Sequence, residues 1–308
     1  MTKLKIGLVG FGKIARDEHV PAIAVHPGAE LIAVASRNAK ADGVANYPDL
    51  ETMLAGEPDL DAIALCQPPQ VRFAAARMAL LAGKHVFLEK PPGATLSEVE
   101  ALISLAQEQR VTLYASWHSR FAPDVECAKA WAAERTITRV TINWKEDVRR
   151  WHPGQDWIWE PGGFGVFDPG INALSILTEV ISEPVRLTDA SILIPANRGA
   201  PIAAGMNMET ASGAPMTAAF DWRQTGPQIW QIIFEAGDER FDFVQGGDDA
   251  ANTAEGEESG LSSEYRAMYR RFVSLVKNGL SDVDLAPLRL VADAFLIGRM
   301  TTTDAFHD

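Results

Sequence analysis

Cysteine is scarce in this chain of 308 residues, which contains only Cys66 and Cys127. Two cysteines cannot form a disulfide framework, and their spacing does not match that of a zinc site. The six histidines never fall at H-x-x-x-H or a similar ligand spacing, so we expect no metal site. The scarcity of cysteine favours a reducing compartment, and we therefore expect a cytoplasmic protein.

Long apolar runs and positive charge are also lacking. No uninterrupted apolar run reaches the roughly 18 residues of a membrane span, and the first residues lead into a predicted strand without a cleavable signal. The net charge of −13 argues against nucleic acid as a partner. A hydrophobic content of 47% with 22% charged residues is typical of a globular protein, and the length allows two domains.

Tryptophan, in contrast, is concentrated in one stretch, Trp144–Asn172. Four of the eight tryptophans lie between Trp144 and Trp159, among lysine, arginine, histidine and acidic residues, before a Gly/Pro-rich turn that carries Asp168. Rigid aromatic faces beside converging polar groups are typical of a pocket for a small polar ligand. A loop whose tryptophans fill a core would draw on the same residues, so the rest of the chain has to decide between the two.

The first 119 residues alternate between strand and helix patterns. Short apolar runs predict strands at 3–9, 31–35, 62–66, 85–88 and 111–115, with helical patterns between them. Thr95 and Glu98 have the spacing of a capping box at the start of one helix. This order predicts a doubly wound parallel α/β sheet, a Rossmann domain over residues 1–119, with ligands at the carboxyl ends of the strands.

A glycine motif, G-x-G-x-x-A, follows the first strand at residues 10–15. Gly10 would allow the tight turn and Gly12 the close approach of a pyrophosphate, while Ala15 would let the helix pack on the strand. A turn that binds nothing has the same sequence, and the βαβ context favours the dinucleotide site. At this edge we expect the cofactor-binding residues Gly10, Gly12, Lys13, Ile14, Ser36, Arg37, Gln67, Pro68, Glu89 and Lys90.

The end of the second strand indicates which dinucleotide is bound. An NAD site usually has Asp or Glu there, whereas this chain has Ser36-Arg37-Asn38. A carboxylate would repel the 2′-phosphate of NADP, and Arg37 could pair with it. We therefore predict that NADP is preferred and that NAD is also accepted. The alternative is that Arg37 is a solvated surface residue.

The pattern changes after His118. A helix is predicted near 123–133, followed by extended segments at about 137–146, 185–194, 214–223, 228–236 and 239–244. These predict an α+β second domain at 120–308 with a mostly antiparallel, open-faced sheet. The acidic run 246–259 is interpreted as a loop or hairpin tip. Helices are predicted at 265–277 and about 287–299, the last returning to pack on the first domain.

Taken together, these motifs resemble those of the Gfo/Idh/MocA oxidoreductases. The resemblance rests on the glycine motif, on Glu89-Lys90-Pro91 at a strand end and on the run 162–172. Within the family the chain is most similar to the bacterial L-arabinose/D-galactose 1-dehydrogenases, because the run Trp144–Asn172 matches that group closely and the likeness covers nearly the whole chain. The resemblance implies NAD(P)-dependent oxidation of an aldopyranose at C1 to the aldonolactone.

The family's catalytic residues map onto three positions. The resemblance implies that Lys90 lies at the reaction centre and that Asp168 and Asn172 face the sugar. Most of the wider family has histidine in place of Asn172, and asparagine cannot act as a base near neutral pH. Asp168 is our first choice of base, with Lys90 stabilising negative charge on oxygen, although a neutral Lys90 could be the base itself. Asn172 could instead cap the next helix.

The remaining candidates for sugar binding carry aromatic or hydrogen-bonding side chains. With Asp168 and Asn172 they are His118, Glu146, Trp151, His152 and Trp230. The polar members could equally make structural hydrogen bonds, and the tryptophans could belong to the core. Two other functions stay open: a dehydrogenase of another polyol or cyclitol, and a catalytically silent sugar- and dinucleotide-binding sensor. A homodimer or homotetramer through the open sheet is expected from the family.

Overall fold

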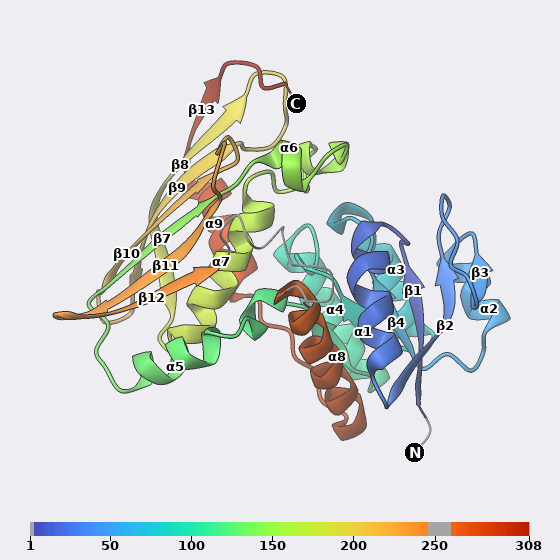
Figure 1. Cartoon of the computed structure of the whole chain (residues 1–308). Coiled ribbons are helices and arrows are strands. Elements are labelled where there is room, and N and C mark those ends of the chain that lie inside the picture. Colours follow the sequence, from blue (N-terminus) through green and yellow to red (C-terminus); the bar gives the residue numbers. More distant parts are fainter. Residues whose placement is uncertain (1–2, 246–259, 308) are drawn as a thin grey trace. The chain divides into compact units, whose positions relative to one another are not determined.

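The computed structural model describes residues 3–245 and 260–307, and the predicted loop at 246–259 lies outside them. The chain divides into two compact units (Figure 1). Unit 1 comprises Met1–His118 and Leu261–Asp284, and unit 2 comprises Ser119–Gly260 and Leu285–Asp308. The first division falls one residue before the predicted boundary, and the second unit is interrupted by a segment that belongs to the first.

Unit 1 is built on a six-stranded parallel sheet, as the sequence predicts. Its order is β3-β2-β1-β4-β5-β6, so successive crossovers run outward from β1 in both directions. The strands are β1 (Leu4–Val9), β2 (Ala29–Ala35), β3 (Ala45–Tyr47), β4 (Ala62–Leu65), β5 (His85–Leu88) and β6 (Leu113–Ala115). All four residues of β4 are buried, which explains why the strand is a continuous apolar run. The edge strand β3 was not predicted.

Helices connect these strands and cover the sheet. They are η1 (Ala15–His19), α1 (Val20–Val25), α2 (Leu50–Gly56), α3 (Pro69–Leu81) and α4 (Leu96–Gln109), joined by α8 (Gly260–Asn278) from late in the sequence. The capping box of α4 is confirmed, because Thr95 Oγ1 accepts from the Glu98 backbone and the Glu98 carboxylate accepts from the Thr95 backbone. Val9, Met53, Ile63, Leu80 and Leu102 belong to the core on one face of this sheet.

Unit 2 contains a seven-stranded sheet of order β12-β11-β7-β10-β9-β8-β13. The strands are β7 (Arg139–Lys145), β8 (Val185–Pro195), β9 (Ala203–Thr210), β10 (Pro215–Asp221), β11 (Ile229–Ala236), β12 (Glu239–Gln245) and β13 (Arg299–Thr303). Only the β7–β10 and β8–β13 pairs are parallel. The predicted, mostly antiparallel sheet is therefore confirmed, with β9 and β13 as additional strands.

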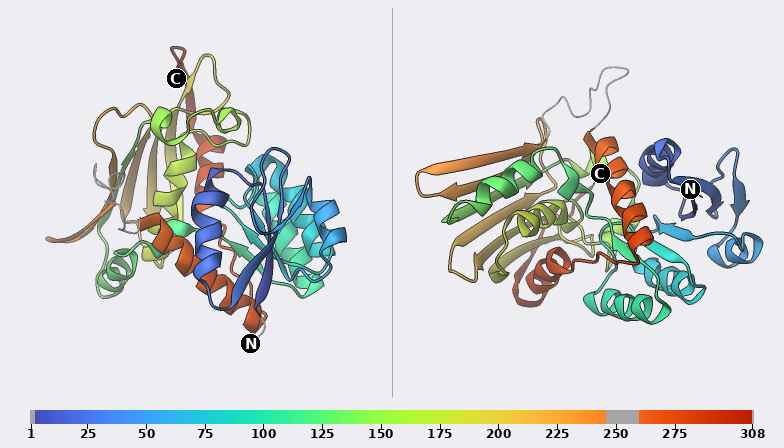
Figure 2. Two further views of the ribbon diagram at one scale, coloured as in Figure 1. Left: turned by 45° about the vertical axis from the view of Figure 1, so that its right-hand side comes forward. Right: turned by 90° about the horizontal axis from the view of Figure 1, so that it is seen from below.

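One face of this sheet is covered by helices, as Figures 1 and 2 show. The helical segments of this part are η2 (His118–Phe121), α5 (Val125–Ala133), α6 (Val148–Trp151), η3 (Asp156–Trp159), α7 (Phe167–Val180) and α9 (Ala286–Ile297). Along β7, Val140, Ile142 and Trp144 are buried, while the alternate residues Thr141 and Asn143 are half-buried on the opposite face.

The two late helices form where the sequence predicts them, as α8 and α9. Helix α9 packs on α7 and β8 and belongs to unit 2, whereas the sequence predicts packing on the first domain. It is α8 that joins unit 1, where Tyr265, Tyr269 and Phe272 are fully buried. Both segments are amphipathic helices, and periodicity alone cannot say which sheet a helix covers. No helix among residues 3–245 and 260–307 is long and apolar enough to cross a membrane.

Candidate functional site

The glycine motif forms an open turn between β1 and η1. Gly10 has φ of 88°, and a Cβ there would lie 2.9 Å from the backbone nitrogen of Gln67, so the position requires glycine. At Gly12, which is exposed, a Cβ would have nothing within 4 Å. Lys13 pairs with Asp17, and Ile14 is the residue before η1. The turn therefore leaves its backbone accessible to a bulky anion, as a pyrophosphate site requires.

The end of β2 offers a cation and no carboxylate. The backbone nitrogen of Ser36 donates to the carbonyl of Tyr47 at 2.9 Å, which holds the loop. Arg37 is exposed, and no residue within the described ranges pairs with its guanidinium. This arrangement fits a ligand that carries a phosphate at the same edge of the sheet.

The loops after β4 and β5 are tied together by Arg72, which was not predicted from the sequence. Its buried guanidinium donates to the backbone carbonyls of Gln67, Glu89 and Pro91. Pro68 is the residue before α3, and Lys90 is joined to Pro91 by a cis peptide. The sequence contained a signal that could have identified Arg72. It is the arginine on the buried stripe of α3, whose other residues are apolar.

His118, predicted as a sugar ligand, has a partner in its own unit. Its Nδ1 lies 2.7 Å from Oε2 of Glu264 on α8, and both side chains are largely buried. The alternative reading of His118, a structural hydrogen bond, is therefore present in the fold. Glu264 was not predicted as its partner, because nothing in the sequence connects two residues so far apart.

In unit 2, Glu146 holds a buried carboxylate directly after β7. Its Oε1 accepts from the indole nitrogen of Trp222 at 3.1 Å, and its Oε2 accepts from that of Trp230 at 3.0 Å. Glu146 is only 5% exposed. Two indole donors fix the carboxylate in place and leave acceptor positions on both oxygens. The donor Trp222 was not predicted.

His152 lies between two carboxylates. Its Nε2 is 3.7 Å from Oε1 of Glu146 and 3.9 Å from Oδ2 of Asp168, while its Nδ1 is 3.5 Å from Oε1 of Gln155. The imidazole also stacks at a tilt on Trp222, with ring centroids 5.2 Å apart. Three predicted sugar ligands, Glu146, His152 and Asp168, thus come together. Both carboxylates lie just beyond hydrogen-bonding distance of the imidazole, which suits a bridging ligand hydroxyl.

Asp168 and Asn172 lie one helical turn apart on α7. Asp168 is buried in the first turn of the helix, and Asn172 is half-buried. The helix begins at Phe167, so Asn172 is an interior residue and the helix-capping alternative for it is wrong. Their i, i+4 spacing places both side chains on the same side of α7.

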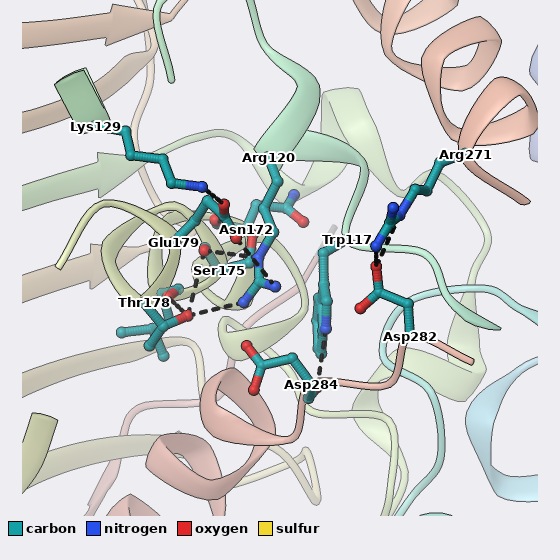
Figure 3. Close-up of polar contacts among 11 residues, drawn as sticks. Trp117, Arg120, Lys129, Asn172, Ser175, Thr178, Glu179, Arg271, Asp282 and Asp284 are labelled. Carbon is teal, nitrogen blue, oxygen red and sulfur yellow. Dashed lines mark hydrogen bonds and ion pairs between the residues drawn. The ribbon is translucent and has the colours of Figure 1, made fainter. Parts of the chain in front are cut away.

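The same helix is anchored by Arg120, as Figure 3 shows. Arg120 Nε donates to the carbonyl of Ser175 and its Nη2 to Oγ1 of Thr178, both at 3.0 Å, and Ser175 Oγ donates to the carbonyl of Asn172. Figure 3 also shows a contact within unit 1, where the indole nitrogen of Trp117 donates to the carbonyl of Asp284. In unit 2, Arg120 therefore holds the turn of α7 that follows Asn172.

The two predicted stacking tryptophans lie next to each other. Trp151 and Trp230 are both half-buried, with ring centroids 5.3 Å apart, and Trp230 stacks on the buried Trp144. Trp151 also donates from its indole nitrogen to Gln228 at 3.3 Å. The Trp-rich stretch thus divides into core residues, such as Trp144 and Trp159, and residues with accessible ring surface.

The chain is similar to known oxidoreductases over its whole length. Residues 4–116 match the model of the Gfo/Idh/MocA oxidoreductase family, described as an NAD-binding Rossmann fold. Galactose 1-dehydrogenase of Pseudomonas fluorescens is 42% identical over 310 residues, covering 100% of both chains. The crystal structure of D-galactose-1-dehydrogenase from Rhizobium etli has a TM-score of 0.91 and 52% identity, and covers 100% of this chain and 99% of that one.

A more distant structure shares the fold alone. Myo-inositol 2-dehydrogenase from Lactobacillus plantarum has a TM-score of 0.82 at 14% identity, and covers 96% of this chain and 97% of that one. Three findings lead to one assignment. They are the glycine turn on a parallel sheet, the second unit with its mostly antiparallel sheet, and the full-length relative at 42% identity. The chain belongs to the Gfo/Idh/MocA family of oxidoreductases.

Proposed function

We propose that the protein is an aldose 1-dehydrogenase that oxidises a pyranose of the D-galactose or L-arabinose type to its aldonolactone. The observation that carries this proposal is the cluster of Glu146, His152 and Asp168, in which two carboxylates and an imidazole lie beside half-buried indole rings. Such a cluster offers hydrogen bonds to sugar hydroxyls and a flat apolar surface to the ring. The full-length similarity to galactose 1-dehydrogenases supports the same choice.

Oxidation at C1 requires a hydride acceptor and a group that takes the hydroxyl proton. A nicotinamide dinucleotide held at the glycine turn and Arg37 of unit 1 would supply the hydride acceptor. We assign the base to Asp168, and we assign to Lys90 the stabilisation of negative charge on the C1 oxygen. Asn172 would hold the same oxygen or its neighbour through its amide, since it cannot take a proton near neutral pH.

Recognition of the other hydroxyls falls to Glu146 and His152. The Glu146 carboxylate is held by two indoles and can accept from a vicinal pair of hydroxyls. D-galactose and L-arabinose pyranoses share configuration from C1 to C4 and differ by the C5 hydroxymethyl. We expect both to be substrates, with a difference of about 1–3 kcal/mol in the activation free energy for one small group.

For the cofactor we propose a preference for NADP over NAD. It is supported by the exposed Arg37 at the end of β2 and by the lack of Asp or Glu in the sequence Ser36-Arg37-Asn38. For assembly we propose a homodimer or homotetramer through the open face of the unit 2 sheet. That face carries small and polar side chains around a shallow hollow of about 300 Å³ at Asn143, Ser191, Asn207 and Thr217.

The test is a sugar panel with both cofactors, followed by absorbance of the reduced nicotinamide, for the wild type and Asp168→Asn. We expect kcat to fall by about 10²–10⁴-fold in the variant, the usual contribution of a positioned general base. Asp156→Asn is the matched control, because Asp156 is an exposed carboxylate of the same stretch and should leave kcat unchanged. A loss confined to KM would make Asp168 a sugar ligand.

Other outcomes of the panel would overturn the wider proposal. Turnover of a cyclitol or another polyol in place of the two aldoses would assign a different substrate class. Binding of galactose and NADP without formation of NADPH would indicate a sensor.

A further inference from the structure

Glu89, the residue before Lys90, is a buried carboxylate with three hydrogen-bond partners. Its Oε1 lies 2.9 Å from Nε2 of His19 and accepts from the hydroxyl of Tyr265 at 2.8 Å. Its Oε2 accepts from the backbone nitrogen of Lys90 at 3.0 Å. Glu89 is 4% exposed, so this anion is stabilised by protein groups and by very little water.

The hydrogen bonds keep Glu89 charged. Burial alone would raise the pKa of Glu89, but the hydrogen bonds and charge of His19, with the Tyr265 hydroxyl, lower it to about 2. Burial opposes a charge on His19 as well, yet the acidic groups around it, Cys66, Tyr269 and Glu89, raise its pKa well above the ordinary value. Removing one donor to a buried charge leaves that charge poorly compensated, which is costly.

The donors come from segments far apart in the sequence. His19 ends η1, the helix that follows the glycine turn, whereas Tyr265 lies on α8. Tyr269, one turn further along α8, has its hydroxyl 2.7 Å from Nδ1 of His19. The carboxylate therefore connects the glycine turn, the strand end at Lys90 and a late helix.

We propose that Tyr265 is a positioning residue for Lys90, acting through the Glu89 carboxylate. The carboxylate fixes the backbone of Lys90 on one side, and Arg72 fixes the carbonyl of Glu89 on the other. The inference rests on the proposed function, in which Lys90 stabilises charge at C1. A displacement of about 1 Å at a reacting group can lower the rate by roughly 10²-fold, so loss of this anchoring should lower kcat.

The test compares Tyr265→Phe with Tyr269→Phe. Both tyrosines are fully buried on the same helix, and each variant loses one hydroxyl, so the two should lower Tm by similar amounts. Tyr265 donates to Glu89, whereas the Tyr269 hydroxyl bonds to His19. We expect Tyr265→Phe to lower kcat by about tenfold with the sugar KM within about twofold, and Tyr269→Phe to leave kcat within about twofold of the wild type.

A second measurement does not depend on turnover. The hydrogen-exchange rate of the Lys90 backbone amide, measured in the protein without sugar, should be severalfold higher in Tyr265→Phe than in the wild type. In Tyr269→Phe it should be unchanged. Equal loss of kcat in both variants, or equal exchange at Lys90 in both, would overturn the positioning role. If the wild type oxidises no aldose, the proposed function fails, while the exchange comparison still decides whether Tyr265 holds Lys90.

Discussion

At the scale of single residues, Arg37 is the residue expected to distinguish the two dinucleotides. It is exposed at the end of β2, so its removal should not disturb the fold. A charge-assisted hydrogen bond is worth about 1.5–3 kcal/mol, and Arg37→Ala should lower the NADP/NAD ratio of kcat/KM by roughly 10–100-fold. Arg77→Ala, which removes an exposed arginine on α3, is the control. An unchanged ratio in Arg37→Ala would show that Arg37 does not determine the cofactor preference.

Glu89 should also make stability depend on pH. Its pKa of about 2 in the folded protein lies below its ordinary value of 4.5, so the stabilisation is complete above pH 4.5 and is lost as the pH falls toward 2. The difference corresponds to about 3 kcal/mol. Denaturant unfolding between pH 7 and pH 3 should show a steeper decline in the wild type than in Glu89→Gln. Parallel curves for the two proteins would contradict this, and Glu100→Gln, at an exposed glutamate, should follow the wild type.

At the scale of elements, the glycine-rich turn before α7 sets the position of Asp168. Gly165 has φ of 54°, and a Cβ there would lie 2.3 Å from the carbonyl oxygen of Pro201. Gly213 has φ of 91°, but a Cβ there would meet nothing within 4 Å. Gly213→Ala should therefore cost only the roughly 1–2 kcal/mol of the left-handed backbone, whereas Gly165→Ala adds a steric clash and should cost about 3 kcal/mol or more. Thermal unfolding of both variants tests this, and similar destabilisation in the two would argue against the close approach at Gly165.

The C-terminal segment packs on the tryptophans next to Glu146. Asn197 donates to the Phe306 carbonyl and accepts from its backbone nitrogen, both at 2.8 Å. The Phe306 ring lies 5.8 Å from that of Trp159, which contacts Trp222 at 5.2 Å, the indole that donates to Glu146. If Glu146 binds the sugar, Phe306→Ala should raise the sugar KM with little change in kcat.

The size of that effect follows from the aromatic pair that Phe306 forms with Trp159. Such a pair contributes about 0.5–1.5 kcal/mol, which corresponds to roughly 2–10-fold in KM. Phe241→Ala is a matched control, because Phe241 is also half-buried and lies at a similar tilt, 6.0 Å from Trp131. Steady-state kinetics on both variants should separate them. An equal change in KM would show that the contact of Phe306 with Trp159 does not contribute to sugar binding.

At the scale of the whole molecule, the open sheet face is the surface on which the proposed assembly depends. Ala219 lies on that face in β10, half-buried beside the hollow. An arginine there would place an unpaired charge inside a closely packed interface. Light scattering should give a multiple of 33.5 kDa for the wild type and a smaller mass for Ala219→Arg. Ala74→Arg, at an exposed site on α3, should keep the wild-type mass, and a monomeric wild type would exclude the assembly.

Much of the architecture follows from local patterns. Buried parallel strands are continuous apolar runs, so β4 is recognised from Ala62–Leu65 and β5 from Val86–Leu88, which follow His85. β9, in contrast, has the sequence Ala-Ala-Gly-Met-Asn-Met-Glu-Thr, which has little intrinsic strand preference. It forms because β8 and β10 flank it and both pair with its backbone. Short or weakly patterned strands depend on such neighbours.

The sequence by itself determined which residue types were available for chemistry and the order of elements that carry them. The glycine motif, Arg37 at a strand end, and Asp168 with Asn172 at helical spacing are all local features, and local features are set by neighbours within a few residues. Only the tertiary structure decided which distant groups meet. The two indoles on Glu146, the bond from Glu264 to His118 and the bonds of His19 and Tyr265 to Glu89 join segments up to 176 residues apart. Such pairings depend on packing over the whole unit, which a local pattern cannot specify.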